Sequence, residues 1–211
     1  IVYLDSEEME TYQMYTKLLL KYYDSDTKTF KNNPEVKKLL MRRKSVLHKA
    51  QDKYRVFESV LDELVRQEKS KYCFVYAPEG FDSVDDDVRI IENMQNIVNS
   101  KYPYIRTNSL IGGDSKRKDK IRAFEEGHID MLFAMKCLDE GVDVPRTEIG
   151  VFTSSTGNPR QFIQRRGRLL RKHKDKVFAT IFDLIVVPNF NFNRDKNTFD
   201  MERSLVKGEL T

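Results

Sequence analysis

The feature that most constrains the fold is a change of hydrophobic period near residue 71, after which short apolar runs alternate with helix-like stretches. The apolar and β-branched runs cover residues 72–77, 104–111, 129–135, 148–153 and 177–187. Stretches with helical spacing lie between them, at residues 83–100, 115–126 and 158–171. Strands that alternate with such helices form βαβ units, whose strands are parallel. The sequence therefore predicts an α/β fold with a mostly parallel sheet and helices on both of its faces.

The first 69 residues have a different pattern, which predicts an α-helical lead-in or connector. After a short extended entry at residues 1–4, we expect Ser6 to cap a helix, because acidic residues follow it. Pro34 is expected to open the next helix. Apolar residues then keep three–four spacing up to residue 69, interrupted at residues 42–44, which predicts two helices or one bent helix. We thus expect a lead-in at 1–69, an α/β domain at 70–188, and a tail at 189–211 with a short helix near Met201.

Composition indicates a globular chain that stays in the cytoplasm. Charged residues make up 33% of the 211 residues and hydrophobic residues 39%, and aromatic residues are too frequent for a disordered chain. No apolar run approaches the length of a membrane span, and no signal peptide is visible. The two cysteines and three histidines have no metal-binding spacing, so no metal site is expected. The chain begins with Ile rather than Met, as a fragment of a longer protein or a purification artefact would.

Positive charge is concentrated in two places, although the net charge of +4 is modest. Residues 165–176 contain seven Lys or Arg and one Asp, and residues 116–122 form a second basic cluster. Such clusters are typical of surfaces that bind phosphate groups. A solvated face that keeps the protein soluble would have the same composition, and the clusters alone do not decide between these interpretations.

The helix expected at residues 161–171 has two different faces. Gln164, Arg168 and Arg171 are spaced four and three apart and therefore project from one side. The apolar residues fall elsewhere around the helix, where they can enter a core: Phe162, Ile163, Leu169 and Leu170. A glycine in the middle of a helix, here Gly167, lowers the stability of the helix by about 1 kcal/mol relative to alanine. We expect a close packing contact or a close approach to a ligand to compensate for this loss. Two arginine forks and a glutamine in a row form a receptor for phosphate oxygens, although an amphipathic helix with a solvated basic side fits the pattern as well.

An acidic loop follows the third expected strand. It contains Glu140, Gly141 and Asp143 and ends at Pro145. In parallel sheets ligands bind beyond the carboxyl ends of the strands, where a carboxylate can hold ribose hydroxyls. Asp143 is our candidate for that role, and a capping or turn aspartate is the alternative. A second acidic group, at residues 85–87, is interpreted as the first turn of a helix rather than as a metal site.

These segments resemble the motifs of superfamily 2 helicases. The run from Gln164 to Arg171 is similar to the Q-x-x-G-R-x-x-R signature, motif VI, and residues 138–145 resemble motif V. Residues 73–77 match the position of motif IV, and Gly112-Gly113 with residues 122–124 resembles the block between motifs IV and V. The resemblance covers about residues 70–187. It is strongest to XPB-type DNA translocases and the motor subunits of restriction systems, and Gln164 in place of the usual His of DEAD-box proteins favours DNA.

The resemblance implies the second RecA-like domain of a two-domain motor, with ATP and Mg²⁺ in the cleft between the domains. Arg168 and Arg171 would be arginine fingers with Gln164 beside them, Asp143 would hold the ribose, and Glu140 with Gly141 would couple nucleotide state to the nucleic acid. Contacts to the phosphate backbone of DNA would come from Gly112, Gly113, Lys136, Ser154 and Ser155.

One departure from the family pattern changes the expected activity. The chain contains no Walker A sequence and no Asp-Glu-x-His box, so we expect that the first motor domain, which would hold most of the Mg²⁺ ligands, is missing. The chain alone is then expected neither to hydrolyse ATP at a useful rate nor to unwind DNA. Its expected partners are DNA, the missing RecA-like domain and restriction or repair subunits. A non-catalytic nucleic-acid-binding module and an RNA helicase are the alternative functions.

Overall fold

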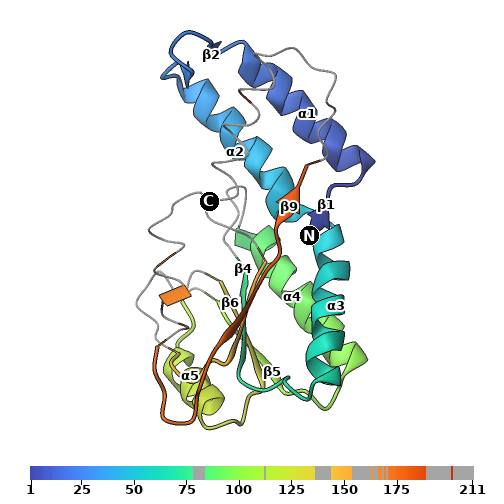
Figure 1. Cartoon of the computed structure of the whole chain (residues 1–211), viewed down its shortest axis with the longest axis vertical. Helices are drawn as coiled ribbons and strands as arrows, with labels where there is room; N and C mark the ends of the chain where they lie inside the picture. The colour runs from blue at the N-terminus through green and yellow to red at the C-terminus, as the bar shows by residue number, and fades with distance from the viewer. Residues whose placement is uncertain are drawn as a thin grey trace.

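The computed structural model of the chain describes most of its residues (Figure 1). The described residues are 1–77, 84–111, 113–135, 144–153, 163, 166–167, 169, 171–188 and 201, and for residues 84–87 the description is limited to the backbone. Within this part of the chain, no helix is both long enough and apolar enough to cross a membrane.

The centre of the molecule is a five-stranded parallel sheet in the order β5-β6-β4-β7-β8. Its strands are β4 (Cys73–Ala77), β5 (Thr107–Leu110), β6 (Met131–Met135), β7 (Ile149–Phe152) and β8 (Thr180–Asp183). Every residue of β4, β6 and β7 is buried, as expected for strands with helices on both sides. The predicted α/β class and parallel sheet are confirmed.

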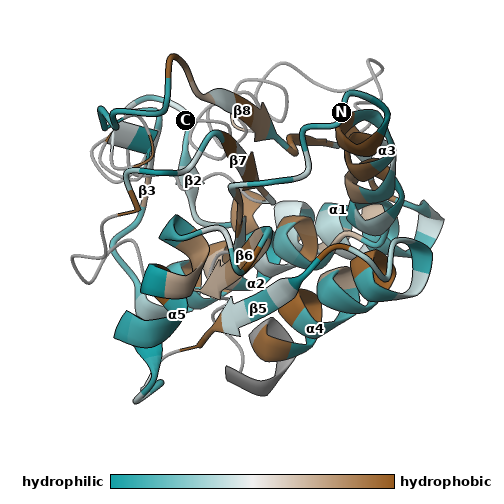
Figure 2. Cartoon of the chain, turned by 90° about the horizontal axis from the view of Figure 1, so that it is seen from below, coloured by the Kyte–Doolittle hydropathy of each residue, from teal (hydrophilic) through white to brown (hydrophobic). Residues whose placement is uncertain are grey.

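Helices cover both faces of this sheet. On one face, α3 (Asp52–Arg66) and α4 (Val84–Lys101) share a core with Cys73, Val75 and Ala77 of β4. On the other face, Phe74 and Tyr76 share a core with α5 (Arg117–Glu125). Figure 2 shows the apolar strands β6 and β7 between α5 on one side and α4 on the other. Because side chains alternate between the two faces along β4, they contribute to two separate cores.

An antiparallel helical hairpin stands at one end of the molecule (Figure 1), formed by α1 (Ser6–Leu20) and α2 (Pro34–Lys49). A small ribbon of β2 (Tyr23–Asp24) and β3 (Thr29–Phe30) connects them. The predicted start of α2 at Pro34 is confirmed. The predicted cap of α1 is wrong by one residue, because the side chain of Asp5 caps the helix and forms a reciprocal capping box with Glu8.

Of the two alternatives predicted for the second helical stretch, two helices or one bent helix, the structure has two helices. The break lies at Ala50 and not at residues 42–44. Arg43 does not interrupt α2, because its side chain is fully buried and hydrogen-bonded to α1. Its Nε donates to Oγ1 of Thr16 at 2.9 Å, and its Nη2 donates to the hydroxyl of Tyr12. A charged residue that finds buried polar partners is compatible with a continuous helix.

The predicted single strand at residues 177–187 is divided into two. After β8 the chain leaves the main sheet, and β9 (Val186–Val187) pairs in parallel with β1 (Val2–Tyr3). The N–H of Leu184 still donates to Phe152 of β7, whereas the carbonyl of Ile185 already accepts from Val2. Val2 and the α3 residues Phe57 and Leu61 are part of the same core as the sheet. This packing joins the sheet to elements on both sides of the expected boundary at residue 69.

Candidate functional site

The parallel sheet brings the ends of the motif-like segments to one edge. Strands β5, β6 and β7 end at Leu110, Met135 and Phe152, and the segments that resemble the intervening block, motif V and motif VI follow them in the sequence. Because all five strands run in the same direction, their carboxyl ends lie at the same edge of the sheet. The three segments therefore begin at this edge.

The motif VI segment (residues 161–171) is attached to this edge by Arg166. The Arg166 guanidinium donates to a carboxylate oxygen of Asp183, the last residue of β8. It also lies over the ring of Phe152, the last residue of β7, with 4.5 Å between the guanidinium carbon and the ring centroid. Only 11% of the Arg166 side chain is exposed. Arg166 therefore positions the segment on the sheet and is not one of the solvated phosphate-binding cations of the predicted basic cluster.

Leu169 provides the second attachment of the motif VI segment. It is 1% exposed and belongs to the core formed with Phe74, Tyr76 and Phe152. It lies so close to Gly150 of β7 that a Cβ atom at Gly150 would be 2.8 Å from Cδ1 of Leu169. A side chain on β7 at this position would displace the segment, so the glycine allows the helical residues to approach the sheet. The predicted burial of Leu169 is confirmed.

The prediction that Ile163 enters the core is wrong, because its side chain is 68% exposed. Gly167 is also exposed, and a Cβ there would have no neighbour within 4 Å. The close packing contact predicted as one alternative for Gly167 is absent among the described residues, and the other alternative, a close approach to a ligand, stays a prediction.

The turn after β5 contains Gly113, one of the predicted nucleic-acid contacts. Gly113 has a φ of +81° and is open to solvent, as expected of a turn that can approach a ligand closely. Asp114 and Lys120 hold the turn: Nζ of Lys120 donates to Asp114 at 2.6 Å and to the carbonyl of Ser109 at 2.8 Å. The Lys120 ammonium and then the backbone N–H of Lys116 lower the pKa of Asp114.

Most of the other predicted site residues lie outside the described part of the chain. These are Gln164, Arg168, Glu140, Gly141, Asp143, Gly112, Lys136, Ser154 and Ser155. Arg171 is described and exposed. The sequence interpretation did not identify Arg166 or Asp183 as site residues, because neither their spacing nor their surroundings in the chain indicates that they meet.

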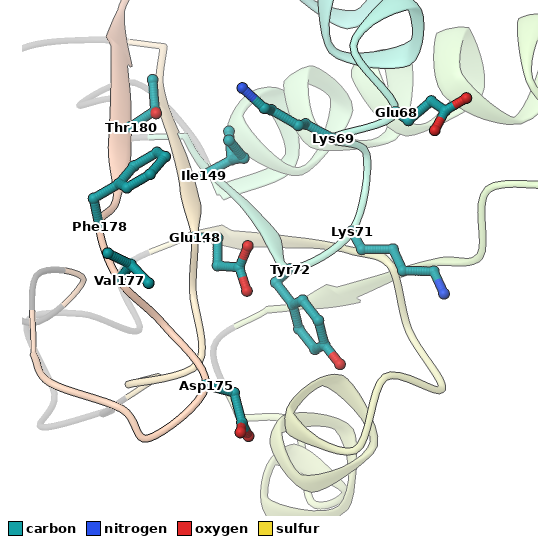
Figure 3. A pocket seen from close by; sticks show the side chains of 10 residues that line it. All are labelled: Glu68, Lys69, Lys71, Tyr72, Glu148, Ile149, Asp175, Val177, Phe178 and Thr180. Carbon is teal, nitrogen blue, oxygen red and sulfur yellow. The ribbon is translucent and has the colours of Figure 1, made fainter.

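A pocket of about 300 Å³ lies at the opposite edge of the sheet (Figure 3). Tyr72, Ile149 and Thr180 line it, and these residues lie at the amino ends of β4, β7 and β8. Exposed Val177 and Phe178 form part of its wall. Because the motif-like segments begin at the carboxyl edge, this pocket is separate from the candidate nucleotide site.

The fold and the segments at its carboxyl edge define an α/β domain of the RecA-like class. Comparison with known proteins identifies the family: residues 53–173 match the helicase conserved C-terminal domain, and the chain belongs to this family. It is a C-terminal domain of the superfamily 2 helicase type, as the motifs predicted. The match includes α3, in agreement with the packing of that helix on the sheet.

Individual relatives match shorter segments. The DNA 3′-5′ translocase XPB2 of Sulfurisphaera tokodaii is 41% identical over 61 residues, which are 29% of this chain and 14% of the relative. Competence protein ComFA of Bacillus subtilis is 29% identical over 107 residues, 50% of this chain and 22% of the relative. The aligned segments thus span less than a quarter of these relatives.

A solved structure supports the fold over nearly the whole chain. The C-terminal part of the Fun30 ATPase domain has a TM-score of 0.57 and covers 99% of this chain and 96% of that one. At 11% identity, this likeness applies to the fold alone.

Proposed function

We propose that the chain is the second motor domain of an ATP-dependent DNA helicase or translocase. In this proposal ATP and Mg²⁺ bind between the carboxyl edge of this sheet and a first RecA-like domain that holds most of the Mg²⁺ ligands. Arg168 and Arg171 reach the γ-phosphate with Gln164 beside them, and Asp143 holds the ribose. Glu140 and Gly141 couple the nucleotide to the nucleic acid.

The attachment of the motif VI segment to the carboxyl edge is the observation that carries this proposal. Arg166 and Leu169 attach the segment to β7 and β8, on both sides of Arg168 in the sequence. An arginine finger acts by stabilising charge that develops in the transition state, and therefore needs a rigid support. The side chain of Ile163 is 68% exposed, and in this proposal it contacts the first RecA-like domain.

DNA is the proposed track. The Gln at the start of the motif VI segment favours it, as does the similarity to a protein named as a DNA translocase. Contacts from Gly112, Gly113, Lys136, Ser154 and Ser155 would be to the phosphate backbone, and therefore independent of sequence and sensitive to salt.

ATP hydrolysis by a longer polypeptide that contains both this chain and the proposed first RecA-like domain tests the proposal. We expect DNA to stimulate hydrolysis and Arg168→Ala to lower kcat by about 10³. Lys172→Ala is the matched control, because Lys172 is an exposed basic residue next to the same segment. Stronger stimulation by RNA would favour an RNA helicase. Nucleic-acid binding without hydrolysis would favour a non-catalytic module.

The isolated 211-residue chain provides a second test, because half of the proposed ATP site is missing from it. We expect no nucleic-acid-stimulated hydrolysis from this chain. Hydrolysis that Arg168→Ala abolishes would contradict the expectation that a separate first domain is required.

A further inference from the structure

Lys176 connects the last residue of the motif V segment to the motif VI segment. Its Nζ atom donates a hydrogen bond of 2.6 Å to the carbonyl of Pro145, the last residue of the motif V segment (residues 138–145). The same nitrogen donates a hydrogen bond of 2.8 Å to the carbonyl of Leu169 in the motif VI segment. Lys176 is partly buried and lies in the turn before β8.

The chemistry of these contacts suits a mechanical role. An ammonium group has three donors, and its hydrogen bonds to carbonyl oxygens are charge-assisted and stronger than neutral ones. The carbonyl of Leu169 lies near the end of a helical stretch, where carbonyl groups lack helical partners and a positive charge is favourable. Lys176 therefore satisfies a helix end and holds it beside the motif V segment.

We propose that Lys176 is a positioning residue that keeps the motif V and motif VI segments in one fixed arrangement. Pro145 is two residues from Asp143, and Leu169 directly follows Arg168. A shift at either hydrogen-bonded carbonyl would thus move a residue assigned to the ribose or to the γ-phosphate. The catalytic part of this inference rests on the proposed function, whereas the mechanical link between the segments does not.

The neighbouring lysine provides a matched control. Lys174 lies two residues away in the same basic cluster, and its side chain is exposed. Lys176→Met keeps the approximate length of the side chain but removes the donors, and Lys174→Met makes the same chemical change at an exposed position. Lys176→Arg restores a charged donor group and serves as a conservative rescue.

Hydrogen exchange of the 211-residue chain tests the mechanical link. We expect Lys176→Met to accelerate hydrogen exchange about tenfold in two peptides, one that covers residues 144–149 and one that covers residues 166–173. This factor corresponds to the loss of one charge-assisted hydrogen bond. Lys174→Met should leave both peptides unchanged, and exchange in α4 should be equal in all variants. Faster exchange in only one of the two peptides, or equal acceleration by Lys174→Met, would overturn the inference.

ATP hydrolysis by the longer polypeptide tests the catalytic consequence. A displacement of about 1 Å in a catalytic group can cost about 100-fold in rate, and for a loosened support we expect kcat to fall about tenfold. Lys176→Arg should recover most of this loss. A variant that is only less stable would contain less folded protein, but its KM for ATP would be unchanged. A positioning role predicts a different result, a higher KM for ATP together with a lower kcat, after the rates are corrected for the folded fraction.

The two experiments separate failure of the inference from failure of the proposed function. Unchanged kcat and KM in Lys176→Met, with wild-type hydrolysis present, would overturn the positioning role. Absence of hydrolysis in the wild-type polypeptide would overturn the proposed function and the catalytic part of the inference with it. Hydrogen exchange would still decide whether Lys176 joins the two segments.

Discussion

The contact between Gly150 and Leu169 predicts a strong energetic coupling between β7 and the motif VI segment. A Cβ atom at Gly150 would be 2.8 Å from Cδ1 of Leu169, 3.5 Å from Phe152 and 3.8 Å from Ile181. The first distance requires Leu169 to move, and Leu169 is 1% exposed in a packed core. Gly150→Ala should therefore destabilise the chain through overpacking, by about 1–3 kcal/mol. The lower entropy of the unfolded alanine chain offsets about 0.4–1 kcal/mol of this.

The reverse change creates a cavity at the same place. Leu169→Ala removes a fully buried side chain, which costs about 2–5 kcal/mol. In the double variant, the new methyl group at residue 150 occupies part of the space that the leucine leaves. We therefore expect the double variant to be more stable than the sum of the single changes by at least about 1 kcal/mol.

Urea unfolding of the wild type, the two single variants and the double variant measures this coupling, provided that the m-value stays constant. Additivity to within about 0.5 kcal/mol would refute the reasoning, because it would mean that residues 150 and 169 do not compete for the same space. Leu61→Ala in α3 is a suitable control. Leu61 is also 1% exposed but belongs to the core on the other face of the sheet, so its effect should add to that of Gly150→Ala.

Three further predictions follow from single residues. Glu68 follows the end of α3 and has a φ of +57°, a backbone conformation that glycine adopts at low cost. Glu68→Gly should therefore stabilise the chain against urea by about 1 kcal/mol. A loss of stability would contradict this. Burial raises the pKa of Asp130, but hydrogen bonds from the side chain and backbone N–H of Arg106 outweigh it and lower the pKa. The stability from this lowered pKa is complete above the unfolded-state pKa of about 3.9 and is lost as pH falls through the folded-state pKa. Wild type and Asp130→Asn should therefore differ in unfolding free energy at neutral pH and converge in acid, and a constant difference would be inconsistent with this. Burial raises the pKa of Cys73 to about 12. Peptide mapping should therefore find Cys73 unmodified by iodoacetamide in the folded chain at pH 8, and modified when the chain is unfolded in urea. Rapid modification of the folded chain would show that the thiol is accessible.

Much of the fold could be predicted from local patterns. A fully buried parallel strand is a short apolar run, and the run at Cys73–Ala77 becomes β4 with all residues buried. Pro34 sets the start of α2 because its ring suits the first helical position. Other features depend on contacts that no local pattern contains. The sequence predicted an interruption at residues 42–44, because three basic residues there break the apolar pattern. Arg43 nevertheless lies inside a continuous α2, because its side chain is buried against hydroxyl groups of α1, which the local sequence does not reveal.

The amino-acid sequence by itself determined the α/β class and the family, because periodicity and motif spacing are local properties of the chain. Only the tertiary structure decided which basic residues support the site. Arg166 meets Asp183 seventeen residues away, and Lys176 meets Pro145 across thirty-one residues. Both contacts exist because parallel strands bring distant turns together, and the low exposure of Arg166 follows from the same packing. In the sequence these residues are indistinguishable from the other cations of the basic cluster, because their contacts with distant residues form only when the chain folds.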